Sequence, residues 1–256
     1  MQKMRPFILK ETNWKTVENG HWEVAVLPWG ATEAHNYHLP YSTDNLQCEY
    51  IAEKAAEIAW AKGAKVMVLP TIPFGVNKAQ MDVKFNINMN PSTQFLVLKD
   101  IVESLKTQGC RKLLILNGHG GNHFSHMLRE LYDKNKFFIC AADWYKAADV
   151  KKHFVHSSDH AGEFETSVML HIAPSWVLPL SKAGPGKAKK IKMKSFEEGW
   201  VWAQRAWLGE VTRDTGIGNP ALSSAEKGKK FLEAVIHKIS KLLIELDQAQ
   251  LDDLYK

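Results

Sequence analysis

The chain has few cysteines and no long apolar run. Cys48, Cys110 and Cys140 are isolated and odd in number, which argues against a disulfide framework and fits a reducing cytoplasm. Residues 1–15 contain no apolar stretch long enough for a signal peptide, and no segment approaches the ~20 apolar residues that span a bilayer. We therefore expect a cytoplasmic protein that does not act in a membrane.

A strong excess of one charge is also missing. The 256 residues include 33 Lys and Arg against 28 Asp and Glu, which gives a net charge of +5. The sequence has no Arg-rich patch with interleaved aromatic residues, so we expect no nucleic-acid partner. The one dense run of lysines, residues 181–194, also contains Gly and Pro and is predicted to be an exposed, solvated loop.

The rest of the composition, with 45% apolar and 24% charged residues, is that of an ordinary globular protein with a sizeable core. Short apolar runs alternate with stretches whose apolar residues recur at helical spacing. The predicted strands are residues 23–28, 65–70, 112–117 and 137–142, and the predicted helices are 44–62, 92–108, 122–134, 166–172 and 223–246. This alternation indicates an α/β fold with a mostly parallel central sheet covered on both faces. Without a repeat or a visible boundary, we expect residues 1–256 to form a single domain.

The loop after the first predicted strand carries a first group of metal-binding residue types. Ligands of open α/β sheets bind at the carboxyl ends of the strands, where Glu33, His35, His38 and Asp44 fall. Glu33 and His35 are two apart, so an extended backbone points both side chains the same way. Carboxylate and imidazole together suit zinc, manganese or ferrous iron. The alternatives are that Asp44 caps the next helix in a capping box with Gln47 and that His38 is a surface residue.

A glycine-rich turn, Asn117-Gly-His-Gly-Gly-Asn122, directly follows the third predicted strand. Its glycines allow a tight turn and close approach of the backbone to a ligand. His119 in such a turn is expected at the edge of the sheet, not in the core. A phosphate loop is disfavoured because the Lys-Ser/Thr pair of the P-loop is absent. The alternative is an ordinary strand-to-helix turn with Asn122 as the cap.

A third group opens the fourth predicted helix and contains Asp159, His160, Glu163 and Glu165. In the functional interpretation, His160 is a general acid or base and Asp159 is the carboxylate that orients it. The alternatives are a loop histidine bonded to its neighbour and two glutamates favoured by the helix dipole. Three such groups in one chain, two of them directly after a strand, suggest a dinuclear metal site that activates water.

Together the three groups resemble the creatininase (creatinine amidohydrolase) family. The matching pattern is Gly30-x-x-Glu33-x-His35-x-x-His38-Leu-Pro-x-x-Thr43-Asp44, then Asn117-Gly-His-Gly-Gly-Asn122, then His160-Ala-Gly-x-x-Glu165-Thr-Ser167. The order of these motifs matches that of the family over residues 27–167. A weaker similarity at residues 218–228 extends the resemblance toward the C-terminus. The combination is specific to the family, although each piece is weak alone. The resemblance implies a three-layer α/β/α fold and two divalent metal ions per subunit, of zinc, manganese or iron.

The resemblance also implies the metal ligands, position by position. Glu33, Asp44 and His119 would hold one ion. His35 and Asp44 would hold the other, with Asp44 bridging the two.

The second ion then lacks a ligand. In creatininase a glutamate two residues after the motif histidine fills this role, but this chain has Gly121 there. Creatininase has a non-acidic residue where this chain has Glu163, so we infer that Glu163 supplies the missing carboxylate. Glu165 is the open alternative for this ligand, and an ordinary dipole-favoured position is the alternative for Glu163.

The reaction implied by the resemblance is hydrolysis. A hydroxide that bridges the ions would attack a carbonyl polarised by one metal. His160 would then deliver a proton to the leaving nitrogen, while Asp159 would fix the tautomer of His160. A backbone amide of the Gly120-Gly121 turn is expected to help stabilise the oxyanion.

The substrate pocket departs from the family pattern. Creatininase has a Tyr where this chain has Gly120, and a Trp-Asp pair where it has His156 and Ser157. We take Gly120 and His156 as substrate-binding positions and predict that creatinine is not the physiological substrate. The leading interpretation is an amidohydrolase that cleaves the C–N bond of a cyclic or small amide.

Two other functions stay open. The same dinuclear site could act on another bond, because relatives hydrolyse cyclic sugar ketones such as inososes, formylamides or short peptides. A non-catalytic ligand- or metal-binding protein on this fold would need a missing ligand or proton shuttle. The sequence retains all five candidates, Glu33, His35, Asp44, His119 and His160.

The resemblance further implies a homo-oligomer, commonly a hexamer, with a small molecule as substrate. Three of the nine tryptophans, Trp200, Trp202 and Trp207, are close in sequence. Exposed aromatic residues are enriched at interfaces. The alternative is that these tryptophans pack into a core near the C-terminus.

Overall fold

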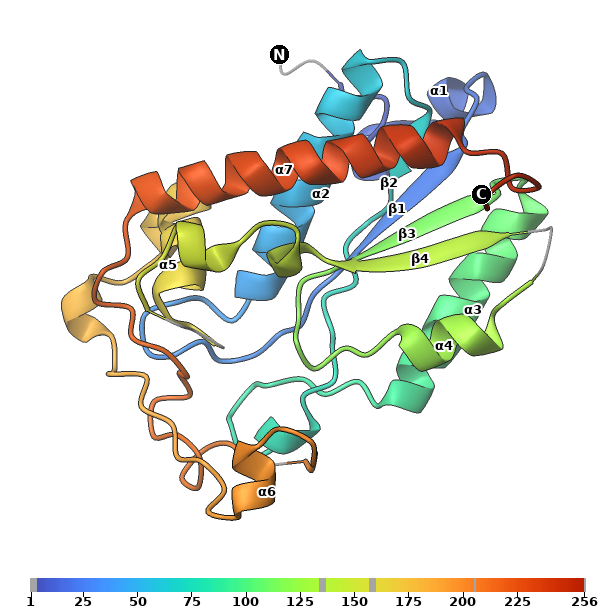
Figure 1. Ribbon diagram of the computed structural model, residues 1–256. Coiled ribbons are helices and arrows are strands. Elements are labelled where there is room, and N and C mark those ends of the chain that lie inside the picture. Colours follow the sequence, from blue (N-terminus) through green and yellow to red (C-terminus); the bar gives the residue numbers. More distant parts are fainter. Residues whose placement is uncertain (1–3, 134–136, 157–159, 205, 256) are drawn as a thin grey trace.

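Four parallel strands form one sheet at the centre of a computed structural model, which describes residues 4–133, 137–156, 160–204 and 206–255 (Figure 1). The strands are β1 (Val24–Trp29), β2 (Val66–Val68), β3 (Lys112–Asn117) and β4 (Phe138–Asp143). Their order across the sheet is β2-β1-β3-β4. The α-helices are α1 (Trp14–Glu18), α2 (Thr43–Ala61), α3 (Pro91–Thr107), α4 (Ser125–Glu130), α5 (Glu163–Ile172), α6 (Lys194–Glu197) and α7 (Ala225–Gln248). Single 3-10 turns are η1 (Leu9–Glu11), η2 (Lys78–Gln80), η3 (Trp144–Lys146), η4 (Val150–Lys152), η5 (Pro174–Trp176) and η6 (Leu180–Lys182).

Helices cover both faces of the sheet, because the central strands are apolar on both sides. All residues of β1 and β3 are buried. Val24 and Val26 of β1 join the core cluster that contains α2, α5 and α7, whereas Leu27 and Trp29 join the cluster with α3 and α4. This alternation follows from the two-residue period of a strand. The predicted α/β fold, with three layers and a parallel sheet, is therefore confirmed.

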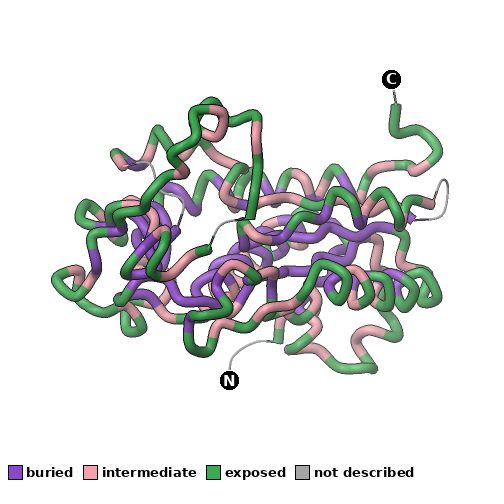
Figure 2. The backbone as a smooth tube through the Cα atoms, turned by 90° about the horizontal axis from the view of Figure 1, so that it is seen from below, coloured by how far each residue is buried: buried purple, intermediate pink, exposed green. Residues whose placement is uncertain are grey.

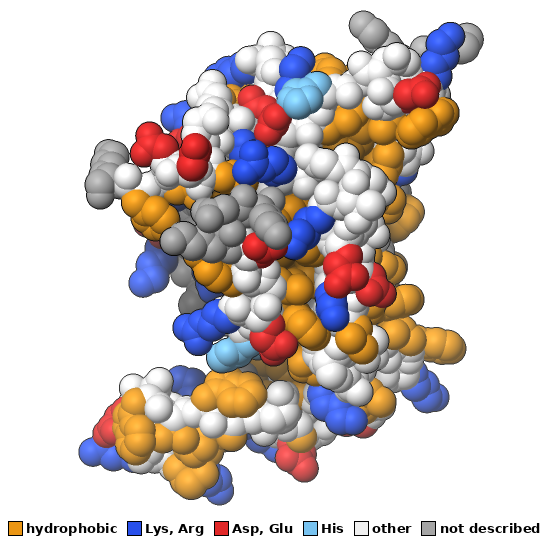
Figure 3. Space-filling view, turned by 90° about the vertical axis from the view of Figure 1, so that its right-hand side faces the viewer, with side chains coloured by type: hydrophobic (Ala, Val, Ile, Leu, Met, Phe, Trp, Pro, Cys, Tyr) orange, Lys and Arg blue, Asp and Glu red, His pale blue; other side chains and the backbone are white. Residues whose placement is uncertain are grey.

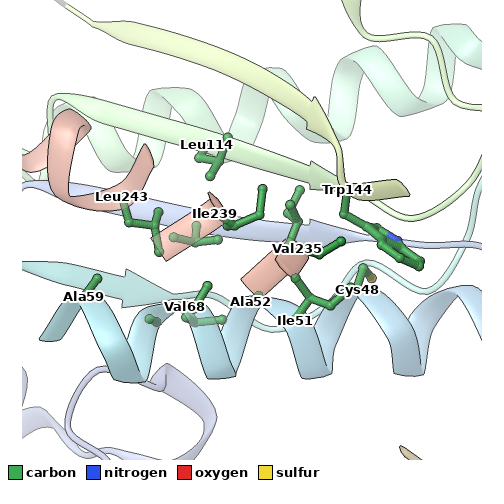
Figure 4. Close-up of a cluster of buried hydrophobic side chains, with 14 of the residues drawn as sticks. Cys48, Ile51, Ala52, Ala59, Val68, Leu114, Trp144, Val235, Ile239 and Leu243 are labelled. Atoms are coloured by element: carbon green, nitrogen blue, oxygen red, sulfur yellow. The ribbon is translucent and has the colours of Figure 1, made fainter. Parts of the chain in front are cut away.

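The larger core lies between the sheet and the pair of helices α2 and α7 (Figure 4). α7 begins at Ser224, whose side chain accepts the backbone N–H of Lys227. Its buried residues Val235, Ile239 and Leu243 recur every four positions and so form one face. Fully burying each such side chain contributes about 1.5–3 kcal/mol, so this face anchors the helix.

Most predicted elements occur, and two are shorter than predicted. The predicted strand 112–117 coincides with β3, and the predicted helices 44–62 and 92–108 match α2 and α3 to within one residue at each end. The predicted helix 122–134 is reduced to α4. Asn122 does not cap it, because its side chain accepts the N–H of Val76 and donates to the carbonyl of Gly30. The predicted strand 65–70 ends early, where Pro70 offers no N–H.

The candidate functional residues lie beyond the carboxyl ends of the strands. Glu33 and His35 follow β1, and His119 follows β3. In Figure 2 the buried residues, drawn in purple, include the central strands and also parts of the loops outside the sheet. Because parallel strands end at one edge, these loops meet there, as the sequence predicted.

The surface carries both charges, with apolar side chains between them. Figure 3 shows acidic and basic side chains interspersed on one face, and a projecting lobe at the bottom that bears hydrophobic side chains. α6 lies at the bottom of the molecule in Figure 1. The segment around it exposes Met193, Trp200 and Trp202, with 59%, 72% and 77% of each residue accessible. Within the described ranges, every helix is too short or too polar to cross a bilayer.

Candidate active site

Six buried acidic and histidine residues converge at the carboxyl edge of the sheet. They come from four segments: the loop after β1, the first turn of α2, the turn after β3, and the entry to α5. The residues are Glu33, His35, Asp44, His119, His160 and Glu165. Charged groups are rarely buried without a partner, so their convergence points to a function.

The first group that could hold a metal ion is Glu33, Asp44 and His119. His119 Nδ1 lies 3.0 Å from Glu33 Oε1 and 3.1 Å from Asp44 Oδ2. The three ligand atoms all lie within 4.8 Å of one another, which is close enough for them to share one ion. This is the set that the family resemblance implied for the first ion.

The second group is His35, Asp44 and Glu165. His35 Nε2 lies 3.0 Å from Asp44 Oδ1, whereas His119 lies beside the other oxygen, Oδ2. The two oxygens of Asp44 thus face the two groups separately. This is the geometry required of a carboxylate that bridges two ions.

A third group joins His160 to the same cluster. His160 Nδ1 lies 3.7 Å from Glu33 Oε1, and the rings of His160 and His35 are 4.1 Å apart. The described residues also allow Glu33, His35 and His160 to share an ion. His160 therefore lies beside the cluster, as either a ligand or a proton carrier.

Backbone carbonyl groups fix the orientation of all three histidine rings. His35 Nδ1 lies 3.1 Å from the carbonyl oxygen of Glu33, His119 Nε2 3.1 Å from that of Val76, and His160 Nε2 2.8 Å from that of Ala34. A carbonyl can only accept, so each of these nitrogens donates. The other nitrogen of each ring is then free to present a lone pair to the cluster, which is the usual arrangement of metal-binding histidines.

The charges of the cluster fit a divalent cation. Burial lowers the pKa of His35, but Asp44 outweighs it and raises this pKa to about 10. Burial likewise opposes protonation of His119, yet Glu33 and Asp44 hold its pKa well above the usual value. Asp44 Oδ2 is buried and, although His119 Nδ1 lies 3.1 Å away, it accepts no well-aligned hydrogen bond from the described residues. In the absence of a metal, protonated imidazoles balance the carboxylates, and a bound cation would take over that role.

We expect metal binding to release protons from these imidazoles. Zinc titrated into metal-free protein at pH 7 should release about one proton for each imidazole that enters the ligand set. Calorimetry in two buffers of different ionisation enthalpy measures this number. The release should fall as the pH rises past the pKa of about 10 of His35. Zinc binding at pH 7 without proton release would contradict the assignment.

Glu163 does not belong to the cluster, and our inference that it replaces the missing ligand is wrong. Its Oε1 pairs with Lys227 Nζ at 2.6 Å, and its Oε2 accepts the backbone N–H groups of Val155 and His156. Residues two apart on a helix point to nearly opposite sides, at about 200°. Only one glutamate of this turn can therefore face the histidines, and that residue is Glu165.

Gly121 could not carry the missing ligand. A Cβ at this position would lie 2.4 Å from His119 Nε2 and 2.4 Å from the carbonyl oxygen of Val76. A side chain would therefore break the bond that orients His119. The carboxylate for the second group comes instead from α5, across the cluster.

A pair of alanine variants tests this steric argument. We expect Gly121→Ala to weaken metal binding about 10- to 100-fold, the loss typical of a disrupted outer-shell hydrogen bond. Gly120→Ala is the matched control, because a Cβ at Gly120 meets no atom within 4 Å. Competition with a coloured zinc chelator measures both affinities. Equal affinities would show that the turn tolerates a side chain at Gly121.

Two structural alternatives from the sequence are wrong. Asp44 lies inside the first turn of α2 and does not cap it, and Gln47 instead donates to the carbonyl of Glu165. His38 is not a surface residue. It is buried, its Nε2 lies 2.9 Å from Thr166 Oγ1, and burial lowers its pKa to about 4.

The remaining site predictions have different outcomes. Asp159 lies outside the described residues. His156 lies beside Glu163 and is half-buried. Gly120 is exposed next to His119, with open space above its Cα. Substrate binding by Gly120 and His156 remains a prediction.

The sequence did not reveal the residues that support Glu33 from the segment after β2. Gln80 Nε2 donates to Glu33 Oε2, and Asn86 Nδ2 donates to Gln80 Oε1 at 2.6 Å. Asn86 Oδ1 also accepts the N–H of Ala34 at 2.8 Å. Amide side chains in a polar loop carry no motif, so only the fold identifies them.

A parallel sheet with buried carboxylates and oriented histidines at its carboxyl edge has the fold and the donor set of a metal-dependent enzyme. The creatininase model, described as creatinine amidohydrolase, matches residues 10–243. The chain therefore belongs to the creatininase family, and the resemblance seen in the motifs is confirmed.

Known proteins match over most of the chain. A solved structure of a putative creatinine amidohydrolase from Bacteroides fragilis is 42% identical, with a TM-score of 0.91 and coverage of 100% of both chains. The mycofactocin precursor peptide peptidase of Mycobacterium tuberculosis is 26% identical over 220 residues, which are 82% of this chain and 80% of the relative. A structure named "Creatininase Mn" is 21% identical, with a TM-score of 0.79, and covers 96% of this chain and 100% of its own. This last likeness concerns the fold alone.

Proposed function

We propose that this amidohydrolase holds two divalent cations and cleaves the C–N bond of a cyclic or small amide other than creatinine. One observation carries the proposal: the two oxygens of Asp44 face two separate ligand groups. Glu33 and His119 would complete one ion, and His35 and Glu165 the other. Bound there, the cations would polarise a substrate carbonyl and lower the pKa of a coordinated water.

His160 is the proposed proton carrier. Its Nε2–H donates to the carbonyl of Ala34, so the basic atom that faces the cluster is Nδ1. Nδ1 would accept a proton from the attacking water and then donate it to the leaving nitrogen, which could not depart as an anion. The backbone N–H groups of the Gly120-Gly121 turn, in which Gly120 is exposed, are candidates to stabilise the developing oxyanion.

Zinc and manganese are the first ions to test. Carboxylate and imidazole ligands suit both, and they also suit ferrous iron. Related creatininase structures are named as a manganese form and as a Zn-Zn form. Availability in the cell would decide among these metals.

The second candidate is hydrolysis of a peptide bond, which uses the same chemistry on a longer substrate. Two observations favour it: a relative is named as a precursor peptide peptidase, and the space beside Gly120 is open. Formylamides and inosose-type cyclic ketones are further candidates for the same site.

A substrate panel tests the proposal. Protein loaded with zinc or manganese is assayed with lactams, formylamides, short peptides, an inosose and creatinine. We expect turnover of at least one amide, and no conversion of creatinine to creatine at enzyme-like efficiency, because the residues around the cluster differ from those of creatininase. Efficient turnover of creatinine would contradict the substrate assignment, and inactivity on every amide would contradict the reaction class.

A homo-oligomer, such as a hexamer, is also proposed. Trp200 and Trp202 are exposed on the segment around α6, as interface aromatics are in free subunits. Trp207 instead packs against His160. Light scattering measures the subunit number. A cytoplasmic location remains a proposal, favoured by three free thiols.

A further inference from the structure

A segment about 50 residues beyond His160 in sequence packs against it. This segment, residues 207–217, is called the strap here. The backbone of His160 exchanges two hydrogen bonds with Ile217, at 2.9 and 2.8 Å. The ring of Trp207 stands at 87° to the ring of His160, with 5.5 Å between their centroids. The strap therefore contacts both the backbone and the ring of His160.

Thr215 links the strap to the atom that orients His160. Its Oγ1 donates to the carbonyl oxygen of Ala34 at 3.3 Å and accepts the N–H of Asn36 at 2.9 Å. The same carbonyl accepts His160 Nε2 at 2.8 Å. The carbonyl of Thr215 in turn accepts Trp207 Nε1 at 2.9 Å. Thr215 therefore bonds both to the carbonyl of Ala34, which accepts His160 Nε2–H, and to the indole of Trp207, which packs against the ring of His160.

The backbone at this point is unusual. Thr215 has φ of +64°, and the neighbouring Asn36 and Ala161 have φ of +57° and +53°. Positive φ is rare for any residue with a side chain and rarest for a β-branched one. Such conformations persist only where the surroundings fix them, and they cluster at functional sites.

Asp214 is the group that fixes the strap. Its Oδ1 accepts the N–H of Gly216 at 3.1 Å and the hydroxyl of Thr212 at 2.9 Å, and its Oδ2 accepts the N–H of Gly186 at 2.9 Å. The carboxylate is buried and closes the turn on itself. These hydrogen bonds fix the turn that contains Thr215.

We infer that Thr215 is a positioning residue for His160. Its hydroxyl holds the carbonyl of Ala34 so that His160 keeps its proton on Nε2 and presents Nδ1 to the reacting atoms. This inference deepens the proposed function and rests on it. It assigns to a threonine far along the chain the orienting role that was predicted for Asp159 from the motif.

Three threonine variants test the inference on the zinc-loaded protein, with the amide that the wild type turns over fastest in the panel. Thr215→Val keeps the shape and the β-branch but removes the hydroxyl. We expect kcat to fall about 10- to 100-fold, as for a slightly misplaced catalytic group, with KM and bound zinc unchanged. Thr215→Ser restores the hydroxyl and should recover most of kcat. Thr212→Val is the control for the integrity of the strap: Thr212 is also buried and its hydroxyl bonds to Asp214 and to the carbonyl of Gly216, so kcat should fall clearly less than in Thr215→Val.

A second readout does not depend on activity. Long-range ¹H–¹⁵N spectra of histidine-labelled, zinc-loaded protein report which ring nitrogen of His160 carries the proton, with His160→Gln as the assignment control. The wild type and Thr215→Ser should show the Nε2–H form, and Thr215→Val a mixture. Unchanged His160 signals in Thr215→Val, or an equal loss of kcat in Thr212→Val, would overturn the inference. If the wild type hydrolyses no amide, the proposed function fails, and the spectra still decide the role of Thr215.

Discussion

Replacing Glu165 with Ala should remove one metal ion and most of the activity, whereas replacing Glu163 with Ala should remove neither. Glu165 shares a ligand group with His35 and Asp44, so its loss leaves the second ion with two protein ligands. Loss of a residue that only supports a metal ligand lowers activity by up to about 100-fold. Glu165 is a proposed ligand itself, so we expect kcat to fall by more than this. Elemental analysis should show roughly half of the wild-type metal in this variant.

Glu163→Ala is the matched control, because the two glutamates are in the same turn of α5. We expect it to keep its metal but lose stability, since the backbone N–H groups of Val155 and His156 would lose their acceptor. Lys227 is one-third exposed, so its share of the loss is small. The free energy of unfolding should fall by about 2–4 kcal/mol, measured by denaturant titration. Metal loss in Glu163→Ala with retention in Glu165→Ala would reverse our assignment.

Replacing His160 with Gln should separate metal binding from catalysis. Glutamine cannot carry a proton between water and a leaving group, so we expect kcat to fall about 10²- to 10⁴-fold. Bound metal should stay at the wild-type level, because the proposed ligand sets do not include His160. Activity and elemental analysis on one preparation measure both.

His160 Nδ1 also belongs to a group that could hold an ion. Loss of metal in His160→Gln would therefore make His160 a ligand and leave the proton transfer without a carrier. A fall in kcat with full metal content distinguishes the two roles.

The fold was predictable from the sequence because its central strands are continuous apolar runs. β1 and β3 are buried on both faces, so they show no alternation that could be mistaken for an exposed sheet. The glycine-rich turn after β3 and the loop after β1 were located correctly, because parallel strands bring their carboxyl ends together. The start of α4 was predicted three residues too early, because the side chain of Asn122 bonds to other loops and does not cap the helix.

The choice between Glu163 and Glu165 could not be made from sequence. Both are in the first turn of α5, where the helix dipole favours either. Which one faces inward depends on how α5 packs against α2 and α7. Lys227 on α7 decides it by pairing with Glu163, a contact across 64 residues that no local pattern encodes.

Thr215 was invisible for a similar reason. The strap contains no histidine, and its two acidic residues, Glu210 and Asp214, belong to none of the motifs that marked the other segments. Its role depends on one carbonyl group, that of Ala34, which is shared by side chains from distant segments. Every residue has a backbone carbonyl, so the sequence does not show which carbonyl accepts a bond from a catalytic side chain.

The most direct test of the whole account is X-ray diffraction from crystals of zinc-loaded protein, recorded on both sides of the zinc absorption edge. We predict two anomalous peaks on either side of the Asp44 carboxylate, one reached by Glu33 and His119 and the other by His35 and Glu165. A map without a peak beside Asp44, or with zinc held by Glu163, would contradict the account.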